Sequence, residues 1–319
     1  WQGTPIRNNV QNLTSFAPTA DERVGNFSTC GAQCVKVIKD PVTGLPFPNN
    51  QIPLNRLNPV TLNLNKYIKT GTGAGLVVFG RSQADNLDQG VARVDHQIND
   101  NNRLSYRYFT DDLRHAPSYD PNNLLTYVTG IGLGSGIHET NMVLGWTKTF
   151  SPTLLNEFRL GFNRILSRRS PPPLPSMTQL GVRLPVDTDI PAIQSIAVTG
   201  FFTFGDFPAA AYIRNGFEVN EKMSKVINRH TISFGLSGSH YQIKGDNQIN
   251  RMGTYAFSGD ASGNAMADYM LGSLRTFKQG IGEYVDKRIT YVGLFMQDDW
   301  KISKRLTLNL GLRYETTPP

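Results

Sequence analysis

Two cysteines form the most local candidate for covalent chemistry in this sequence. Cys30 and Cys34 are the chain's only cysteines, and three residues separate them. This spacing suits a small turn closed by a disulfide, which persists in an oxidising compartment. Two unpaired thiols or a pair of metal ligands are the alternatives, and metal binding is the weakest because no histidine lies nearby to complete a ligand set. A disulfide is the favoured prediction, and the other two states stay open.

The other residue types that commonly do chemistry lack the spacing that catalysis or metal binding needs. The histidines are scattered, and the sequence has no Gly-x-Ser-x-Gly motif around a nucleophilic serine. The acidic pairs Asp111-Asp112 and Asp298-Asp299 fall at the ends of predicted strands, where solvated rim charges are the simpler interpretation. We therefore expect no catalytic site, no metal and no cofactor, and a protein that is not an enzyme. The histidines are His96, His115, His138, His230 and His240.

The basic charge of the chain does not indicate a nucleic-acid partner. Lys and Arg number 32 against 25 Asp and Glu, which gives a net charge of +7. Binding to phosphates and bases would need basic clusters interleaved with aromatic residues on one face. The densest basic positions, Arg168-Arg169 and the segment 301–305, adjoin turn-like sequence instead. We expect a dispersed, solvated charge and no nucleic-acid binding.

Composition narrows the fold class. Charged residues make up 18% of the chain and hydrophobic residues 39%, while Gly (30) and Pro (19) are frequent. So many turn formers argue against a helical bundle, and so few charges argue against a disordered chain. The longest apolar runs fall far short of the roughly 18 residues that a membrane helix needs. Helical membrane proteins are excluded, whereas membrane proteins that cross with strands are not.

From about residue 87 onward, the hydrophobic pattern has a period of two. In 306–314 every second residue is large and apolar, and the residues between are small or polar. The segment 158–163 repeats the pattern. Such alternation places one set of side chains on each face of a strand, and no helix could gather it on one side. We therefore assign 1–86 to a long, loop-rich segment and 87–319 to antiparallel hairpins.

Short and long connections alternate along these hairpins. Because alternate connections of antiparallel neighbours fall at opposite ends of a sheet, all short turns must lie on one rim and all long loops on the other. This asymmetry is typical of transmembrane β-barrels, which have short periplasmic turns and long extracellular loops. Strands of about 10 to 16 residues also suit a membrane crossing better than a soluble sheet. The short turns lie near 99–102, 151–153, 228–229 and 303–304, and the long connections near 113–137, 170–210 and 246–285.

The alternation predicts which side chains face lipid and which face the barrel interior. The apolar set predicted to face lipid is Phe158, Leu160, Phe162, Leu306, Leu308, Leu310 and Leu312. The polar set predicted to line the lumen, where it meets a plug or water, is Arg159, Asn163, Asn309, Arg313 and Glu315. Aromatic residues near strand ends, which suit the membrane interfaces, are Trp146, Phe150, Trp300 and Tyr314. In 289–300 both faces carry apolar residues, so its lipid-facing side stays unassigned.

Several segments resemble TonB-dependent outer-membrane receptors. The stretches 291–301 and 305–315 are similar to a barrel hairpin shared by these receptors, with Gln-Asp-Asp-Trp at 297–300. Further segments resemble the subgroup that carries a carboxypeptidase-regulatory-like domain ahead of its plug. These segments are 18–28, 46–59, 156–163, 257–259 and 263–268. Each motif is modest, but their order and spacing across the whole chain are more specific.

The resemblance implies a barrel of about 22 strands that surrounds an N-terminal plug. It also implies an unidentified extracellular ligand, lipid of a Gram-negative outer membrane around the barrel, and energy from a periplasmic TonB complex. The chain departs from this pattern because it shows no plug and no TonB-box segment, and its expected 8–10 strands cover less than half a barrel. We therefore expect an internal fragment of a longer protein, in which TonB contacts a region outside this chain.

The sequence thus predicts an all-β, antiparallel transmembrane barrel segment with long extracellular loops. Its expected function is TonB-dependent uptake of a large or scarce solute. A passive porin or adhesion barrel is one alternative, and a soluble extracellular β-protein that binds glycans is another. The segment 263–271 also has enough Ala and Met for a short helix within a loop.

Overall fold

The computed structural model describes residues 1–319 except 30–36, 129–133, 186–188 and 319. Its main feature is one nine-stranded sheet in which every neighbouring pair is antiparallel. The predicted all-β, antiparallel class is therefore confirmed. In sheet order the strands are β1 (Gln2–Phe16), β2 (Leu76–Asn99), β3 (Asn102–His115), β4 (Gly134–Ser151), β5 (Leu154–Ser170), β8 (Ala210–Ile227), β9 (His230–Asn247), β12 (Glu283–Ser303) and β13 (Leu306–Thr316).

The first strands differ from the sequence expectation. The segment 1–86 was predicted to be irregular, but β1 occupies Gln2–Phe16 and β2 begins at Leu76. The sequence of β1 is mostly polar and contains Pro5, so its side chains show no alternation. Its backbone pairs with β2 from Gln2 opposite Gln89 to Phe16 opposite Leu76. Proline is tolerated on such an edge strand, and hydrogen bonds to the partner strand stabilise the extended backbone without an apolar pattern.

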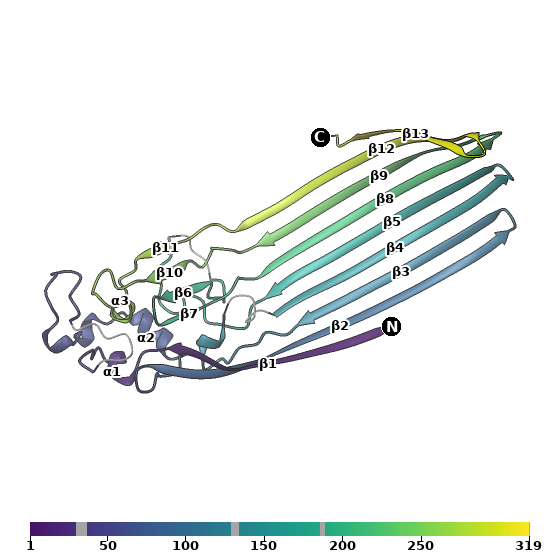
Figure 1. Ribbon diagram of the computed structural model, residues 1–319. Helices are drawn as coiled ribbons and strands as arrows, with labels where there is room; N and C mark the ends of the chain where they lie inside the picture. Colours follow the sequence, from purple (N-terminus) through teal and green to yellow (C-terminus); the bar gives the residue numbers. More distant parts are fainter. Residues whose placement is uncertain (30–36, 129–133, 186–188, 319) are drawn as a thin grey trace.

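Connections segregate by length as predicted. Turns of two residues join the hairpins β2–β3, β4–β5, β8–β9 and β12–β13, and all lie at one rim of the sheet (Figure 1). In one of these turns, Asn228 takes a left-handed conformation with φ 55°, which asparagine tolerates better than most residues. The long connections gather at the opposite rim and form a unit that we call the loop cap. The loop cap comprises the described residues of 17–75, 116–133, 171–209 and 248–282.

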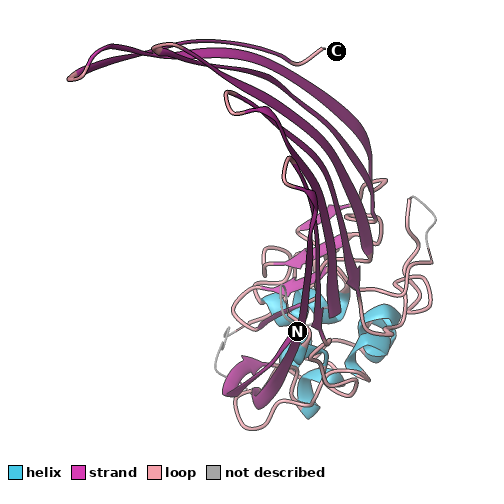
Figure 2. Ribbon diagram, turned by 90° about the vertical axis from the view of Figure 1, so that its right-hand side faces the viewer, coloured by secondary structure: helices cyan, strands magenta, loops and turns pink. Residues whose placement is uncertain are grey.

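The loop cap has secondary structure of its own. A four-stranded sheet in the order β11-β10-β6-β7 joins segments from two different connections. Short helices pack beside it (Figures 1 and 2). The elements are α1 (Ala20–Arg23), α2 (Pro59–Asn65), α3 (Ala265–Leu271), the 3₁₀ turns η1 (Pro48–Asn50), η2 (Leu54–Arg56) and η3 (Leu124–Thr126), β6 (Ser195–Val198), β7 (Phe202–Phe204), β10 (Thr254–Phe257) and β11 (Thr276–Lys278). Helix α3 confirms the predicted helix within 263–271.

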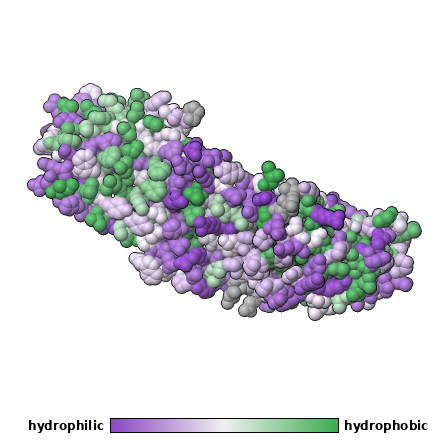
Figure 3. All heavy atoms as spheres, turned by 180° about the vertical axis from the view of Figure 1, so that it is seen from behind, coloured by the Kyte–Doolittle hydropathy of each residue, from purple (hydrophilic) through white to green (hydrophobic). Residues whose placement is uncertain are grey.

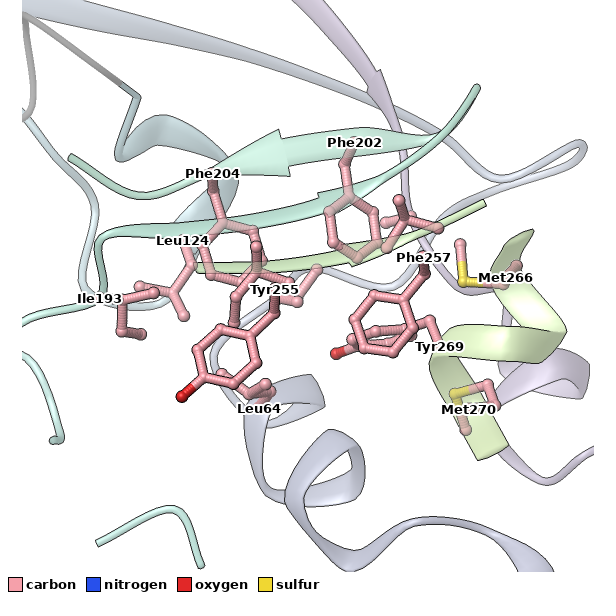
Figure 4. Packing of buried hydrophobic residues seen from close by; sticks show 14 of the residues in the cluster. Leu64, Leu124, Ile193, Phe202, Phe204, Tyr255, Phe257, Met266, Tyr269 and Met270 are labelled. Carbon is pink, nitrogen blue, oxygen red and sulfur yellow. The ribbon is translucent and has the colours of Figure 1, made fainter. Parts of the chain in front are cut away.

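The buried hydrophobic cluster lies in the loop cap, not under the large sheet. Tyr269 of α3 is fully buried, and its ring lies edge-on to those of Phe202 and Phe257, each with centroids 5.4 Å away. Figure 4 shows these rings packed with Leu64 of α2 and Leu124 of η3. The large sheet instead keeps side chains of both faces partly exposed and curves like a piece of barrel wall (Figure 2). Among the described residues, no helix is long and apolar enough to cross a membrane.

Candidate functional site

The register of the large sheet sorts the predicted site residues onto its two faces. Residues paired directly across antiparallel strands point to the same face. One row runs from Arg159 through Asn220 and Ser237 to Gly293 and Glu315. Arg159 and Glu315, which lie on strands far apart in sequence, are therefore on one face. By alternation along β5 and β13, Asn163, Asn309 and Arg313 lie on it too, and we call it the polar face.

The adjacent row is apolar. Leu160 is paired with Val219, Val219 with Gly238, and Gly238 with Val292. By the same alternation, all seven residues predicted to face lipid lie on this face, which we call the apolar face. The sheet is curved, and its convex side faces away from the viewer in Figure 1. Figure 3 shows the molecule from behind, and hydrophobic side chains gather over the strands on this convex side.

The predicted interfacial aromatic residues share the apolar face. Trp146 pairs with Phe158, and Tyr314 pairs with Leu294. Trp300 pairs with His230, and the two rings stack with centroids 5.2 Å apart. Beside the β4–β5 turn, the Lys148 ammonium lies 5.7 Å from the Trp146 ring and 4.6 Å from the Phe150 ring.

The strand that the sequence left unassigned has a clear orientation. Val292, Leu294 and Met296 of β12 lie on the apolar face, because Leu294 pairs with both Leu236 and Tyr314. Tyr291 and Phe295 lie on the polar face. The Tyr291 hydroxyl is 2.8 Å from Arg313 Nη2.

A charged hollow of about 470 Å³ lies on the polar face at the predicted residues Arg159 and Arg313. Lys222 Nζ is 3.8 Å and Arg159 Nη2 is 3.9 Å from the Glu157 carboxylate, so this carboxylate forms ion pairs with both cations. Arg313 forms an ion pair with Glu315 and lies 3.4 Å from Ser237 Oγ. The structure thus brings Arg159, Arg313 and Glu315 into one region, while Asn163 and Asn309 lie elsewhere on this face. Its chemistry is that of a hydrated, charged surface, because its side chains are exposed and share their charges.

Aromatic rings cover glycines on the same face. Tyr241 lies directly opposite Gly216, and Tyr212 lies opposite Gly245. A Cβ atom at Gly216 would lie 3.0 Å from Tyr241 Cε1, which is closer than ordinary packing allows. The Tyr241 hydroxyl donates a hydrogen bond of 2.7 Å to Glu218. The absent side chain of Gly216 therefore lets the ring lie flat along the wall and keeps it out of the space enclosed by the curve.

The loop cap contains a second hollow that sequence reasoning missed. An apolar pocket of about 210 Å³ is lined by Leu64, Met177, Ile196, Tyr255 and Phe257, with Arg183 among the lining residues. Burial raises the pKa of the Tyr255 phenol, whose hydroxyl donates to the Met252 carbonyl at 3.0 Å. The lining comes from three separate connections, so no local sequence motif indicates the pocket. Isolated apolar residues within otherwise turn-rich loops were the one available signal.

Three of the histidines considered for chemistry have polar partners, and the two cysteines lie outside the described residues. His115 pairs with Asp85, His230 Nδ1 lies 2.7 Å from Asp298, and His240 Nδ1 lies 2.9 Å from Thr290 Oγ1. In the described part of the chain, no group of three or more His, Cys, Asp or Glu residues could hold a metal ion. Cys30 and Cys34 fall within 30–36, outside the described residues, so their disulfide stays a prediction.

Comparison with known proteins identifies the family. A family model described as "Outer membrane beta barrel domain" matches residues 1–319. The chain belongs to this family. The predicted location in the outer membrane is confirmed, and the alternative of a soluble extracellular β-protein is wrong. Proteins of this barrel family are typically not enzymes, and no curated protein matches the chain.

Two solved transporter structures match part of the chain. The outer membrane transporter YddB from Escherichia coli matches with a TM-score of 0.47 and 10% identity, over 76% of this chain and 32% of that one. The copper transporter OprC matches with a TM-score of 0.41 and 12% identity, over 88% of this chain and 30% of that one. The outer-membrane barrel chain thus spans about a third of the length of each transporter.

Proposed function

We propose that the chain forms part of the barrel wall of a TonB-dependent receptor that imports a large or scarce solute. The sequence motifs support the subgroup with a carboxypeptidase-regulatory-like domain and a plug. Among the described strands, the nine-stranded wall has an unpaired edge on each side, as a segment of a larger closed barrel requires.

The two faces have different surroundings in this proposal. Lipid meets the apolar face, and the lumen contents meet the polar face. The observation that carries this assignment is the pair of adjacent rows, in which Leu160, Val219 and Val292 alternate with Arg159, Asn220 and Glu315. Outer-membrane barrels have an outward apolar band and a polar interior, so this alternation supports lipid outside and water or plug inside.

Ligand capture belongs to the loop cap in this proposal. The cap lies at the long-loop rim, which in such barrels is extracellular. Its packed core supports a preformed capture surface instead of a set of independent loops. Force on the plug, transmitted from TonB, then opens a path along the polar face.

The proposal is tested first by the coding sequence upstream of Trp1. We expect codons for a signal peptide, a regulatory-like domain, a plug and a TonB box. A single cysteine placed in that box should then form a disulfide cross-link with a cysteine in TonB in living cells, and a scrambled box should not. A start codon directly before Trp1, or equal cross-linking by the scrambled box, would favour a passive barrel.

A further inference from the structure

A shallow hollow interrupts the apolar face near the middle of the strands. It measures about 470 Å³, and its walls are formed by Leu160, Phe217, Val219, His240 and Val292. Gly238 lies at its floor, paired with Val219 on one side and Val292 on the other. A Cβ atom there would meet Val219 Cγ1 at 3.1 Å. The missing side chain of Gly238 therefore opens an apolar hollow on the face assigned to lipid.

Cations lie beside this hollow toward the loop cap. Arg164 is the next residue on the apolar face of β5 after Phe162. On β12, which runs in the opposite direction, Arg288 lies on the same face two residues before Thr290. The two arginines share one row, because Arg164 pairs with Asn215, Asn215 with Gln242, and Gln242 with Arg288. Three strand spacings of about 4.8 Å separate their backbones by roughly 14 Å. Both side chains are exposed.

The local charge balance on these strands is positive. Lys244 lies one row further toward the loop cap, directly opposite Asp286. The Asp286 carboxylate is 3.8 Å from Arg288, so these two rows carry three cations and one acid on β5 to β12. In the next row Arg168 and Asp246 balance each other. On β2 and β3 the corresponding row instead holds Asp88 and Asp112, and Arg114 of the next row lies 3.0 and 3.2 Å from their carboxylates. The local excess of positive charge therefore lies on the strands that carry the hollow.

We propose that the Gly238 hollow and these cations together bind one phosphorylated glycolipid of the outer leaflet. One acyl chain fills the hollow, and phosphates on the sugar headgroup contact Arg164 on one side and Arg288 with Lys244 on the other. Arginine matches phosphate geometry with paired hydrogen bonds, and basic patches beside an apolar band attract anionic headgroups. Two cationic positions set apart across the sheet suit a headgroup with two phosphates. The inference rests on the proposed assignment of the apolar face to lipid.

Lipid binding to the purified protein tests the site. The protein is extracted from outer membranes, freed of lipid in detergent, and titrated with diphosphorylated lipid A or with phosphatidylcholine, and native mass spectrometry counts the bound lipid. We expect lipid A to bind and zwitterionic phosphatidylcholine to bind weakly. Neutralising two cations in R164Q/R288Q should weaken lipid A binding about 30-fold. G238L, which fills the hollow but keeps the cations, should also weaken it.

A matched pair on the opposite face is the control. Arg214 and Lys287 precede Asn215 and Arg288 by one residue and therefore point to the polar face. R214Q/K287Q removes the same charge and should leave lipid A binding unchanged. Equal binding of both lipids, or unchanged binding in R164Q/R288Q and in G238L, would overturn the lipid site alone. Loss of binding in R214Q/K287Q only would show that the faces are reversed, which would overturn the face assignment as well.

Discussion

At the scale of single residues, neighbours in one strand have opposite environments. Leu308 lies on the apolar face and Asn309 on the polar face, although one peptide bond separates them. Arg substitution on the lipid side of a barrel must place a charge in hydrocarbon, whereas on the inner side it meets water or protein. The effect of a new charge on stability therefore depends more on which face of the strand the residue occupies than on its position along the chain.

Paired substitutions measure this difference. We expect Leu160→Arg to lower the free energy of unfolding in lipid by about 2–4 kcal/mol if the residue lies near the bilayer midplane. Leu308→Arg should act in the same direction. Asn309→Arg and Arg159→Gln serve as controls and should have small effects. Urea titration of barrels reconstituted in bilayers gives these values, and equal tolerance on both faces would refute the face assignment.

The Gly216–Tyr241 pair makes a second residue-scale prediction. Gly216→Val should lower the free energy of unfolding by about 1–3 kcal/mol, because the new side chain overlaps the Tyr241 ring. The double variant Gly216→Val/Tyr241→Ala should recover part of the loss, because the atoms that would collide belong to that ring. A double-mutant cycle by urea titration measures the coupling. Strictly additive losses would mean that the ring does not cover the glycine.

At the scale of elements, helix α3 depends on a buried carboxylate. Asp268 is 1% exposed, and its side chain accepts hydrogen bonds from the backbone N–H groups of Gly259, Ala261 and Ser262 at 2.8, 3.3 and 2.8 Å. Asn264 caps the same helix by accepting from Met266 N and Ala267 N. Three donors on one carboxylate fix the preceding loop against the helix.

Removing that carboxylate should loosen the loop cap without unfolding the wall. We expect Asp268→Ala to lower the free energy of local unfolding of 257–271 by about 1.5–3 kcal/mol, because the substitution leaves buried N–H groups without an acceptor. Asp260→Ala is the control, because its ion pair with Arg275 is exposed and worth under about 1 kcal/mol. Hydrogen exchange should rise in 257–271 and stay unchanged in β9. Equal effects of the two variants would contradict this role.

The turn at 40–46 should respond to acid. Arg56 donates to both Asp40 oxygens at 2.8 and 3.0 Å, and this contact, with a hydrogen bond from Val42 N, holds the pKa of Asp40 below its usual range. Because the folded pKa is depressed, the stabilisation is present above the unfolded pKa and is lost as pH falls through the folded value. NMR of the Asp40 carboxyl should give a low midpoint that rises in Arg56→Gln. An unchanged midpoint would exclude Arg56 as the cause.

At the scale of the whole molecule, the wall has unpaired edges. β1 and β13 each have one neighbour among the described strands, and the convex side carries an exposed apolar band. Open edges and apolar faces recruit other chains in water. We expect the chain expressed by itself to sediment as aggregate without detergent and to become dispersed in detergent or lipid. A monomer in detergent-free size-exclusion chromatography would contradict this expectation.

The sequence by itself determined the barrel-wall class, the hairpin turns and the two faces of β5 and β13. It could do so because alternation along a strand and turn chemistry are local properties of the chain. The tertiary structure alone decided that the polar segment Gln2–Phe16 is a strand, that four connections share one core, and that Gly238 opens a hollow between Val219 and Val292. Each of these features depends on which distant residues become neighbours, and that pairing is set by register and packing across the sheet.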